Sequence, residues 1–377
     1  MKLIHTSDWH FGMALGTGSY KYDQRHFLQQ LYDLIEMEKV EAVLLAGDVY
    51  DSSVSNAEAI GLYNEAVTKI CLDLGCKLIV IAGNHDSAPR LSSCRELLKA
   101  SGLYVTGRLT RVLEPVLLDD GKVAVYSLPF FNREEVSALF PEKKEEIRSH
   151  ETAMMVVCDY IRGHMDKEKK NIVLSHALIV NSELSDSDRS ARVGFATAVS
   201  KDVFRDFDYA ALGHIHKPQV IDDHIRYSGS PLKYSFGNEE KQEKGVVLID
   251  TDTMEQTFVA FPPLRDRKTV TGTYEELMAR EDLAGDYLRL HVTDRYAGLE
   301  LIAQLREKFP YLLEVYGMSI TEEESLSALS VEELQTLDEM DIMEKFMAEN
   351  FSYNLTDEQK QLFQDVLQWS REEADLG

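Results

Sequence analysis

The sequence lacks the segments that would direct a chain into a membrane or out of the cell. No apolar run reaches about 18 residues, the length from which a transmembrane helix can form, so no membrane span is expected. The first residues have neither the apolar core nor the small-residue cleavage site of a secretory signal, which favours a cytoplasmic protein. No internal repeat and no low-complexity stretch occurs either, which excludes a repeat architecture.

Cysteine is scarce as well. Of 377 residues, 4 are cysteine, and none of them stands in the Cys-x-x-Cys spacing of a zinc site. Disulfide frameworks are typical of small secreted domains rather than of a chain this long. We therefore expect buried, reduced thiols at Cys71, Cys76, Cys94 and Cys158.

Positive charge is in short supply. The chain has 40 Lys and Arg against 65 Asp and Glu, a net charge of −25. Residues 321–377 hold 16 acids and 3 bases, a net of −13, which leaves −12 for residues 1–320. A free-standing nucleic-acid-binding protein usually has a basic surface. We therefore expect some acids to face metal ions, and any affinity for phosphate to come from metals, a local basic patch or a partner chain.

What the sequence does contain is the pattern of a layered α/β sandwich. Its length and its 44% hydrophobic content suit two or three domains with a sizeable core. Residues 1–260 alternate short apolar runs, typical of strands buried on both faces, with helical patterns. The expected strands are Lys2–Thr6, Ala42–Ala46, Lys77–Ala82, Lys122–Leu128, Asn171–Ser175, Tyr209–Leu212, Ile225–Tyr227 and Gly245–Asp250. The expected helices are Tyr22–Glu38, Asn56–Leu74 and Ser149–Arg162.

Two consecutive prolines, Pro262 and Pro263, end this pattern and predict a domain boundary. We expect a first domain over 1–262, a small α/β capping domain over 263–320 and an acidic helical tail over 321–377. In the capping domain the expected elements, alternately strand and helix, are Lys268–Thr273, Tyr274–Ala279, Asp286–Val292, Gly298–Lys308 and Leu312–Gly317.

The tail predicts two helices with broad apolar faces. The first spans Val331–Asn350, and the second begins at Thr356 with Gln359 in the capping-box position. Such faces pack either on the chain's own domain or on a partner. Within the first domain, the polar stretch Asn181–Arg192 predicts a mobile loop.

Five polar clusters follow strands of the first domain. They are Asp8-Trp9-His10, Gly47-Asp48-Val49-Tyr50-Asp51, Gly83-Asn84-His85-Asp86, Ser175-His176 and Gly213-His214-Ile215-His216. Open α/β sheets place ligands at the carboxyl ends of their strands, so these side chains should meet at one edge. Together they supply enough oxygen and nitrogen ligands for two metal ions, and a two-metal site hydrolyses phosphate esters.

Each cluster has an ordinary explanation when it is taken alone. A carboxylate such as Asp48 can cap a helix, Gly83-Asn84 can form a turn, and paired histidines can be core residues. The five clusters in this order leave little room for those explanations. Gly47 lets the backbone turn so that Asp48 projects into the site, and a carboxylate has two oxygens with which to bridge two ions.

The order Asp-x-His, Gly-Asp-x-x-Asp, Gly-Asn-His-Asp, His and Gly-His-x-His resembles that of the calcineurin-like metallophosphoesterases. Within them, the start MKLIHTSDWH and the segment VIAGNHDS over Val80–Ser87 resemble the bacterial SbcD nuclease subunits and the Mre-type DNA repair nucleases. The segment Gly298–Arg306, followed by Pro310 and a strand to Gly317, looks like their capping domain. The resemblance covers nearly the whole chain.

The resemblance implies two divalent cations, most readily manganese, that activate water against phosphorus. One would be held by Asp8, His10, Asp48 and His216, and the other by Asp48, Asn84, His176 and His214. His85 would stabilise or protonate the leaving oxygen. The Asp51 carboxylate would orient His85, although Asp51 also suits a helix N-cap or turn.

The resemblance also implies partners. The expected activity is that of an exonuclease and endonuclease on double-strand DNA ends and hairpins in repair and recombination. The tail would dock on an SbcC-like SMC-type ATPase, and the nuclease would be a homodimer within a two-plus-two complex. Candidate dimer surfaces are the expected helices Tyr50–Asn64 and Leu91–Lys99. Arg90, Lys217 and Lys233 lie near the motifs and are candidate DNA contacts.

A small-molecule or cyclic-nucleotide phosphodiesterase, or a protein phosphatase, could use the same site. Protein phosphatases tend to carry Gly-Asp-x-x-Asp-Arg-Gly and Gly-Asn-His-Glu, whereas this chain has Ser52 and Ser53 after Asp51, and Asp86 after His85. A cyclic-nucleotide esterase needs neither a capping domain nor an acidic tail. A scaffold without chemistry is disfavoured because all the proposed ligands are present.

Overall fold

The structure, a computed structural model, describes residues 1–15, 18–110, 114–188 and 197–318, together with 340, 343–344, 355–356, 359–364 and 366. Contacts between residues divide the chain into two compact units. The first comprises Met1–Thr293 and Gly298–Tyr316, and it carries the sheets described below. The second comprises Asp294–Ala297 and Gly317–Gly377.

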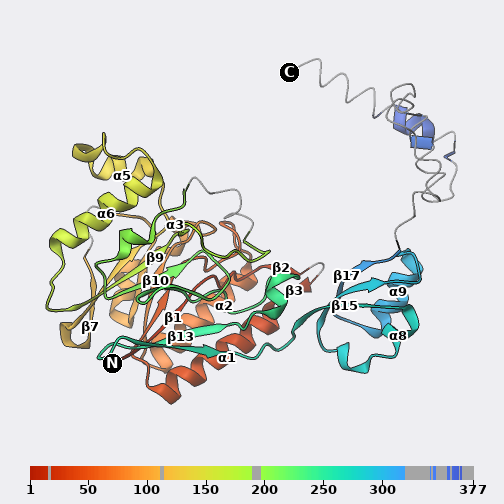
Figure 1. Cartoon of the computed structure of the whole chain (residues 1–377), viewed down its shortest axis with the longest axis horizontal. Helices are drawn as coiled ribbons and strands as arrows, with labels where there is room; N and C mark the ends of the chain where they lie inside the picture. Colours follow the sequence, from red (N-terminus) through yellow and green to blue (C-terminus); the bar gives the residue numbers. More distant parts are fainter. Residues whose placement is uncertain are drawn as a thin grey trace. The chain divides into compact units, whose positions relative to one another are not determined.

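Two six-stranded mixed sheets form the body of the first unit (Figure 1). One sheet has the order β14 (Glu255–Ala260), β13 (Gly245–Asp250), β1 (Lys2–Thr6), β4 (Ala42–Leu45), β5 (Lys77–Ile81) and β6 (Leu103–Thr106). The other has the order β11 (Gln219–Asp222), β12 (Ile225–Tyr227), β10 (Tyr209–Gly213), β9 (Lys170–His176), β8 (Val123–Leu128) and β7 (Val116–Leu118). The central pairs β1–β4, β4–β5 and β9–β10 are parallel, so their carboxyl ends share an edge.

The described helices connect these strands. They are α1 (Lys21–Glu38), α2 (Ala57–Val67), α3 (Ala88–Leu91), α4 (Arg95–Leu98), α5 (Arg133–Leu139), α6 (His150–His164), α8 (Tyr274–Met278) and α9 (Leu299–Lys308). A π-helical turn over Thr68–Asp73 continues α2. Short 3-10 turns span Lys99–Ser101, Asp119–Gly121, Pro141–Lys143, Lys201–Phe204, Asn238–Lys241 and Glu281–Leu283, and β2 (Ala14–Leu15) pairs with β3 (Gly18–Ser19).

The two sheets pack face to face between layers of helices. Alternate residues of a strand point to opposite faces, so Leu44 and Ile79 enter a core shared with Ile172 and Leu174 of the other sheet. The neighbouring residues point outwards into two further cores, one covered by α1 and α2 and the other by α5 and α6 (Figure 1). The predicted layered α/β sandwich is therefore confirmed.

The eight predicted strands are present, each within one residue of its expected bounds. The predicted helices Tyr22–Glu38 and Ser149–Arg162 correspond to α1 and α6, and the predicted Asn56–Leu74 is α2 with its π-helical continuation. Four strands and α5 were not predicted. The strands are β6, β7, β11 and β14, which are the outer strands of both sheets.

A third sheet lies in the segment after the two prolines. Its strands β15 (Arg267–Gly272), β16 (Tyr287–Val292) and β17 (Leu312–Tyr316) are parallel. The helices α8 and α9 pack on it, and Leu277, Leu290 and Leu305 share a core of its own. The small α/β module is therefore present, with each predicted element within a residue or so of the observed one.

Three smaller predictions had mixed outcomes. Cys71, Cys76 and Cys158 are buried, but Cys94 is exposed, so the prediction of a buried thiol is wrong there. It precedes α4, a single turn with no buried residue, so no core reaches it. No described helix is both long and apolar enough to cross a bilayer.

The predictions for the tail fall mostly outside the described residues, including nearly all of Val331–Asn350. The capping box is within them and is confirmed, because the Thr356 backbone N–H donates to Gln359 Oε1 at 3.0 Å and the Gln359 N–H to Thr356 Oγ1 at 3.4 Å. The apolar faces of the tail carry no structural statement.

Candidate metal centre

The ends of five parallel strands carry the proposed ligands. Asp8 and His10 follow β1, Asp48 follows β4, and Asn84 and His85 follow β5. From the second sheet, His176 ends β9, whereas His214 and His216 follow β10. Backbone hydrogen bonds join the first two loops, with Asp8 N donating to Gly47 O and His10 N to Asp48 O, both at 3.0 Å. The loops therefore form one continuous rim.

Four of the proposed ligands have left-handed backbone conformations. The φ angles are 53° at Asp8, 43° at His10, 50° at Asp48 and 99° at His214. A residue with a Cβ adopts this region at a cost of about 1–3 kcal/mol, and such residues persist where the surroundings hold them for a function. Strain of this kind at one rim indicates a site whose side-chain directions matter more than backbone comfort.

Three glycines before the ligands allow the loops to approach one another. A Cβ at Gly83 would lie 2.1 Å from Asp48 Oδ1, and one at Gly47 would lie 2.5 Å from His176 Nδ1. A Cβ at Gly213 would lie 1.9 Å from the Ala46 carbonyl oxygen. Each of these motifs therefore needs glycine for space.

Gly83→Ala should displace Asp48 and weaken metal binding, because the new methyl group would overlap its carboxylate. We expect a bound-metal content well below that of wild type and a melting temperature lower by several degrees. Gly61→Ala is the matched control, since a Cβ there meets no atom within 4 Å and Ala is the better helix former in α2. Elemental analysis and thermal unfolding test this, and equal metal content in both variants would contradict it.

The proposed ligands converge in two groups. In the first, His10 Nε2 lies 3.1 Å from His216 Nε2 and 3.7 Å from Asp48 Oδ2, and Asp8 completes a set with these two histidines. The Asp48 carboxylate also belongs to the second group, because its Oδ2 lies 3.5 Å from His176 Nε2. One buried carboxylate is thus within reach of both groups.

The second group is built around the amide of Asn84. Its Oδ1 lies 2.9 Å from both His176 Nε2 and His214 Nδ1, and those two nitrogens are 3.2 Å apart. His176 Nδ1 donates to the Ala46 carbonyl at 2.8 Å, so the Nε2 lone pair of a neutral ring faces the Asn84 oxygen. Lone pairs converging in this way require a proton or a cation between them, and the donor set fits a metal ion.

The electrostatics of the protein alone agree with a cation site. Burial disfavours charge on His176, but the Asp48 carboxylate overcomes it and raises the pKa of His176 to about 9. Burial opposes ionisation of Asp48 too, yet His176 and His10 hold its pKa well below the ordinary range. Burial and then the His176 charge lower the pKa of His214 to about 3. Positive charge is therefore favoured at some positions of this pocket and excluded from others.

His85 lies beside these groups, but its contact with Asp51 differs from the predicted one. The ring is 4.9 Å from that of His10, and Nδ1 donates to the Asp51 backbone carbonyl at 2.8 Å. The Asp51 carboxylate instead lies 3.5 Å from His10 Nδ1. The prediction that this carboxylate orients His85 is therefore wrong, because the turn after Asp48 directs the carbonyl rather than the side chain to that ring.

Several supporting residues were missed from the sequence. The Asp86 carboxylate accepts hydrogen bonds from the backbone N–H groups of Val49, Tyr50 and Gly83, at 2.8 to 3.2 Å, and so ties two ligand loops together. Lys244, which is buried, donates to the His216 carbonyl at 2.7 Å. Asp86 is part of a predicted motif and could have been found, whereas Lys244 directly precedes β13 and has no local signal.

The predicted mobile loop over 181–192 supplies two more of these residues. Asp188 Oδ1 accepts from the His216 N–H at 3.0 Å, and the Ser187 hydroxyl lies 2.6 Å from His216 Nδ1. Asp188 itself is buried. For residues 181–188 the loop is thus anchored to the site rather than mobile, and 189–192 lie outside the described residues.

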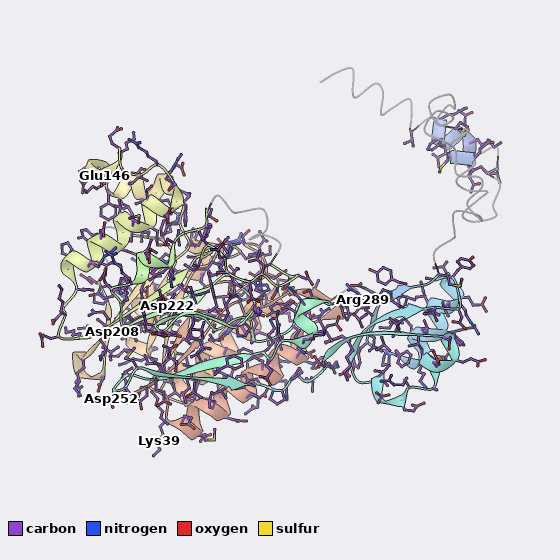
Figure 2. All side chains as sticks on the ribbon, in the orientation of Figure 1. Lys39, Glu146, Asp208, Asp222, Asp252 and Arg289 are labelled. Carbon is purple, nitrogen blue, oxygen red and sulfur yellow. The ribbon has the colours of Figure 1, made fainter. Side chains whose placement is uncertain are left out.

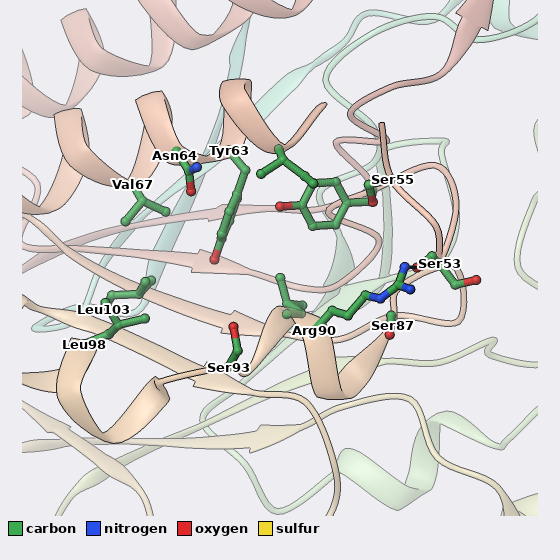
Figure 3. Close-up of a pocket in the computed structure, with 13 residues that line it drawn as sticks. Ser53, Ser55, Tyr63, Asn64, Val67, Ser87, Arg90, Ser93, Leu98 and Leu103 are labelled. Atoms are coloured by element: carbon green, nitrogen blue, oxygen red, sulfur yellow. Dashed lines mark hydrogen bonds between the residues drawn. The ribbon is translucent and has the colours of Figure 1, made fainter. Parts of the chain in front are cut away.

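The three candidate DNA contacts have different surroundings. Lys233 is 12% exposed and donates to Glu240 O and Asp266 Oδ1, both at 2.7 Å, so it ties the third sheet's segment to the body and is not free for DNA. Lys217 pairs with Glu183 at the surface. Arg90 lines a pocket of 290 Å³ outside the metal cleft, with Nη1 donating to Ser53 O at 2.9 Å (Figure 3).

The predicted dimer helices are shorter than expected. Residues 50–56 are not helical, since α2 begins at Ala57, and Leu91–Lys99 is divided between α3 and α4. Val54 and Leu97 are nevertheless 72% and 78% exposed. The apolar character expected of these segments is present, although the continuous helices are not.

Several lysines at the surface of the body are already paired with acids. Figure 2 marks three of those acids, Glu146, Asp208 and Asp222. Each of them lies beside a lysine, at 2.9, 3.4 and 2.5 Å respectively. These lysines are therefore neutralised and do not form a basic patch that would offset the acidic balance of the chain.

A cleft of 350 Å³ opens at the rim of the metal ligands, lined by His10, Asp48, Asp51, His85, His214 and His216 among others. Comparison with known proteins agrees with that chemistry. The family model described as calcineurin-like phosphoesterase matches residues 1–218, and that of the type 5 capsule protein repressor C-terminal domain, SbcD_C, matches 263–351.

Two curated relatives are both named as the D-type subunit of the nuclease SbcCD. The one from Staphylococcus epidermidis is 31% identical over 95% of this chain and 94% of its own length. The one from Staphylococcus saprophyticus is 30% identical over 97% of this chain and 98% of its own. Among solved structures, the Plasmodium protein titled GAP50, the anchor in the inner membrane complex, covers 70% of this chain and 89% of its own at 13% identity, with a TM-score of 0.39, too low to support a conclusion. On the family match and the two near full-length relatives, the chain belongs to the calcineurin-like phosphoesterases and, within them, to the SbcD nuclease subunits.

Proposed function

We propose that the protein is a metal-dependent nuclease that hydrolyses phosphodiester bonds in double-strand DNA ends and hairpins. The observation that carries this is the position of Asp48, whose Oδ2 lies 3.7 Å from His10 Nε2 and 3.5 Å from His176 Nε2. One carboxylate therefore serves two groups of nitrogen and oxygen ligands. The two relatives named as SbcCD nuclease subunits support DNA as the substrate.

The donor set favours two divalent cations, with manganese as the proposed ion. Asp8, His10, Asp48 and His216 would hold one, whereas Asp48, Asn84, His176 and His214 would hold the other. Oxygen and imidazole ligands without thiolate suit manganese or iron. Such a pair, when bound, lowers the pKa of water and neutralises charge on phosphate oxygens.

The protein's own residues have defined tasks around that pair. Asp86 and Asp188 fix the ligand loops through backbone N–H groups, which preserves the spacing of the ligands. His85 keeps its Nδ1 proton on the Asp51 carbonyl, so a protonated ring can donate only from Nε2. We assign that atom to the oxygen of the leaving strand.

The chain is proposed to have three parts. The nuclease domain spans 1–262, the capping domain 263–320 and the acidic tail 321–377. The start of the second family match at 263 and the boundary between the units at Gly317 support these limits. We further propose that the protein works in the cytoplasm as a homodimer with an SbcC-like SMC-type ATPase, by analogy with the names of its relatives.

Linear duplex DNA should be digested in the presence of Mn²⁺ and left intact after chelation. Activity should return when Mn²⁺ is restored to the same preparation, because the ligands are held by the fold in the absence of metal. The assay compares linear duplex with a nick-free circle of the same sequence and with bis-p-nitrophenyl phosphate. Hydrolysis of the aryl ester without any attack on DNA would overturn the DNA assignment and favour a small-molecule phosphodiesterase.

A chain ending at residue 330 should lose the ATPase partner and keep its nuclease domain folded. The tail carries the two predicted apolar helix faces, and its net charge of −13 makes a basic partner surface the natural complement. Co-purification of both chains with the truncated and full-length proteins measures this. Undiminished association of the truncated chain would exclude the tail as the docking segment.

A further inference from the structure

A second cavity, of 640 Å³, opens beside the loop that follows His216. The outer strands β11 and β14 of the two sheets both contribute to its wall, through Val220 and Phe258. None of the described residues that line it also lines the metal cleft. It is therefore a separate site, although its wall includes Lys217, the residue directly after a proposed ligand.

Arg226 is the unusual residue of this cavity. It lies on β12 between Ile225 and Tyr227, which face the helix-covered core, so Arg226 faces the other side of the sheet. It is only 8% exposed, its Nε has no hydrogen-bond partner, and no ion pair joins its guanidinium to a described residue. A buried charge without a partner is costly, and natural proteins retain one mainly where something pairs with it.

The field of this guanidinium reaches the interior. Burial, and after it the positive charge of Arg226, lowers the pKa of His5 to about 3. His5 is held between the sheets by Tyr209 and the Leu212 carbonyl and makes no contact that would neutralise Arg226. The charge is thus uncompensated from the inside of the molecule.

The cavity wall is rigid in the absence of any ligand. The side chain of Gln219 exchanges hydrogen bonds of 3.0 and 2.8 Å with the Glu183 backbone. Asn238 Nδ2 donates to the Leu184 carbonyl at 2.9 Å, and Gln242 Nε2 donates to Ser185 Oγ at 3.1 Å. These contacts join the 183–185 loop to the rest of the wall, so the cavity is preformed.

The charges around the cavity favour an anion. Glu183 is taken up by its ion pair with Lys217. Lys241 is exposed and makes no ion pair with a described residue, and Glu243 is the remaining acid at the rim. Two available cations, Arg226 and Lys241, therefore face one acid.

We propose that this cavity binds the phosphate group of a nucleotide, with the oxyanion on Arg226 and Lys241. A guanidinium presents a planar fork of N–H donors that matches phosphate oxygens. The apolar wall made by Phe258 and Val220 suits the sugar or base next to that phosphate. The phosphate could belong to a free mononucleotide or to a DNA strand, and the experiment below separates these sources. The site needs neither metal nor hydrolysis.

Thermal unfolding of the full chain in EDTA, with Arg226→Met, tests the assignment. Without phosphate, the variant should melt at a higher temperature than wild type, because it lacks an unpaired buried charge. With inorganic phosphate or thymidine 5′-monophosphate, wild type should be stabilised and the variant should not. Calorimetric titration should show affinity at least tenfold weaker in the variant. Arg205→Met, at a guanidinium 70% exposed and far from these residues in sequence, should behave as wild type in both buffers.

The ligand arms identify the source of the phosphate. Arg226-dependent binding of thymidine 5′-monophosphate, but not of thymidine, assigns the site to a mononucleotide. Arg226-dependent binding of a duplex without terminal phosphates, in place of the mononucleotide, assigns it to the DNA backbone. Equal binding by wild type and Arg226→Met overturns the proposal. Should that variant not fold, Lys241→Gln replaces it, with tenfold weaker phosphate binding expected and unchanged binding overturning the proposal.

Discussion

Asp48→Asn should abolish nuclease activity and release both metal ions. The carboxylate lies within 3.7 Å of His10 Nε2 and 3.5 Å of His176 Nε2, so a single substitution removes a charged oxygen from both ligand groups. Outer partners of metal ligands alone are worth about 10–100-fold in affinity, and a shared ligand should be worth more. We expect turnover on linear duplex to fall by at least about 10³-fold.

The asparagine is nearly the same size, so the fold should survive. Its amide oxygen can still accept the hydrogen bond that Asp48 Oδ1 receives from the His85 N–H at 2.9 Å. Asp33→Asn, on the exposed face of α1, is the matched control. Elemental analysis and the DNA assay are read together. A variant that keeps two equivalents of metal would refute the shared-ligand assignment.

His85→Ala should keep its metals and lose most of its turnover on DNA. The His85 ring lies outside both groups of close ligand contacts, and its Nδ1 is held by a backbone carbonyl. A general acid that protonates the leaving oxygen contributes about 10²–10⁴-fold. That range is the expected loss on linear duplex, with metal content unchanged.

The leaving group gives this prediction a second readout. A p-nitrophenolate departs without a proton, so His85→Ala should be far less impaired on bis-p-nitrophenyl phosphate than on DNA. His164→Ala, at an exposed position near the end of α6, should match wild type on both substrates. Equal losses on the two substrates would show that His85 does not supply a proton to the leaving oxygen.

The accuracy of the sequence-based strand assignment follows the position of each strand in its sheet. Inner strands such as β4 and β9 are buried on both faces, so they are continuous apolar runs that a sequence reveals. The missed strands β6, β7, β11 and β14 are all outer strands. Outer strands are short or alternate with polar residues, as Glu255–Ala260 does, and their sequences resemble those of loops.

The ligand motifs were readable because they are local. Each follows a buried strand by a few residues, and parallel strands bring their carboxyl ends to one edge, so proximity follows from the topology. Asp51 shows where this reasoning stops. The position of the residue beside His85 was expected, but whether its carboxylate or its carbonyl makes the contact depends on the backbone course of the turn.

The sequence by itself determined the layered fold, the inner strands and the residues that gather at the rim, because these depend on short-range patterns of apolar and polar residues. The tertiary structure alone decided that Lys233 is committed to Asp266, that Asp188 supports His216, and that Arg226 is buried without a partner. Each of these depends on which surfaces the folded chain brings together across long separations in sequence. Burial and pairing of a charge are properties of those surfaces, and no local pattern records them.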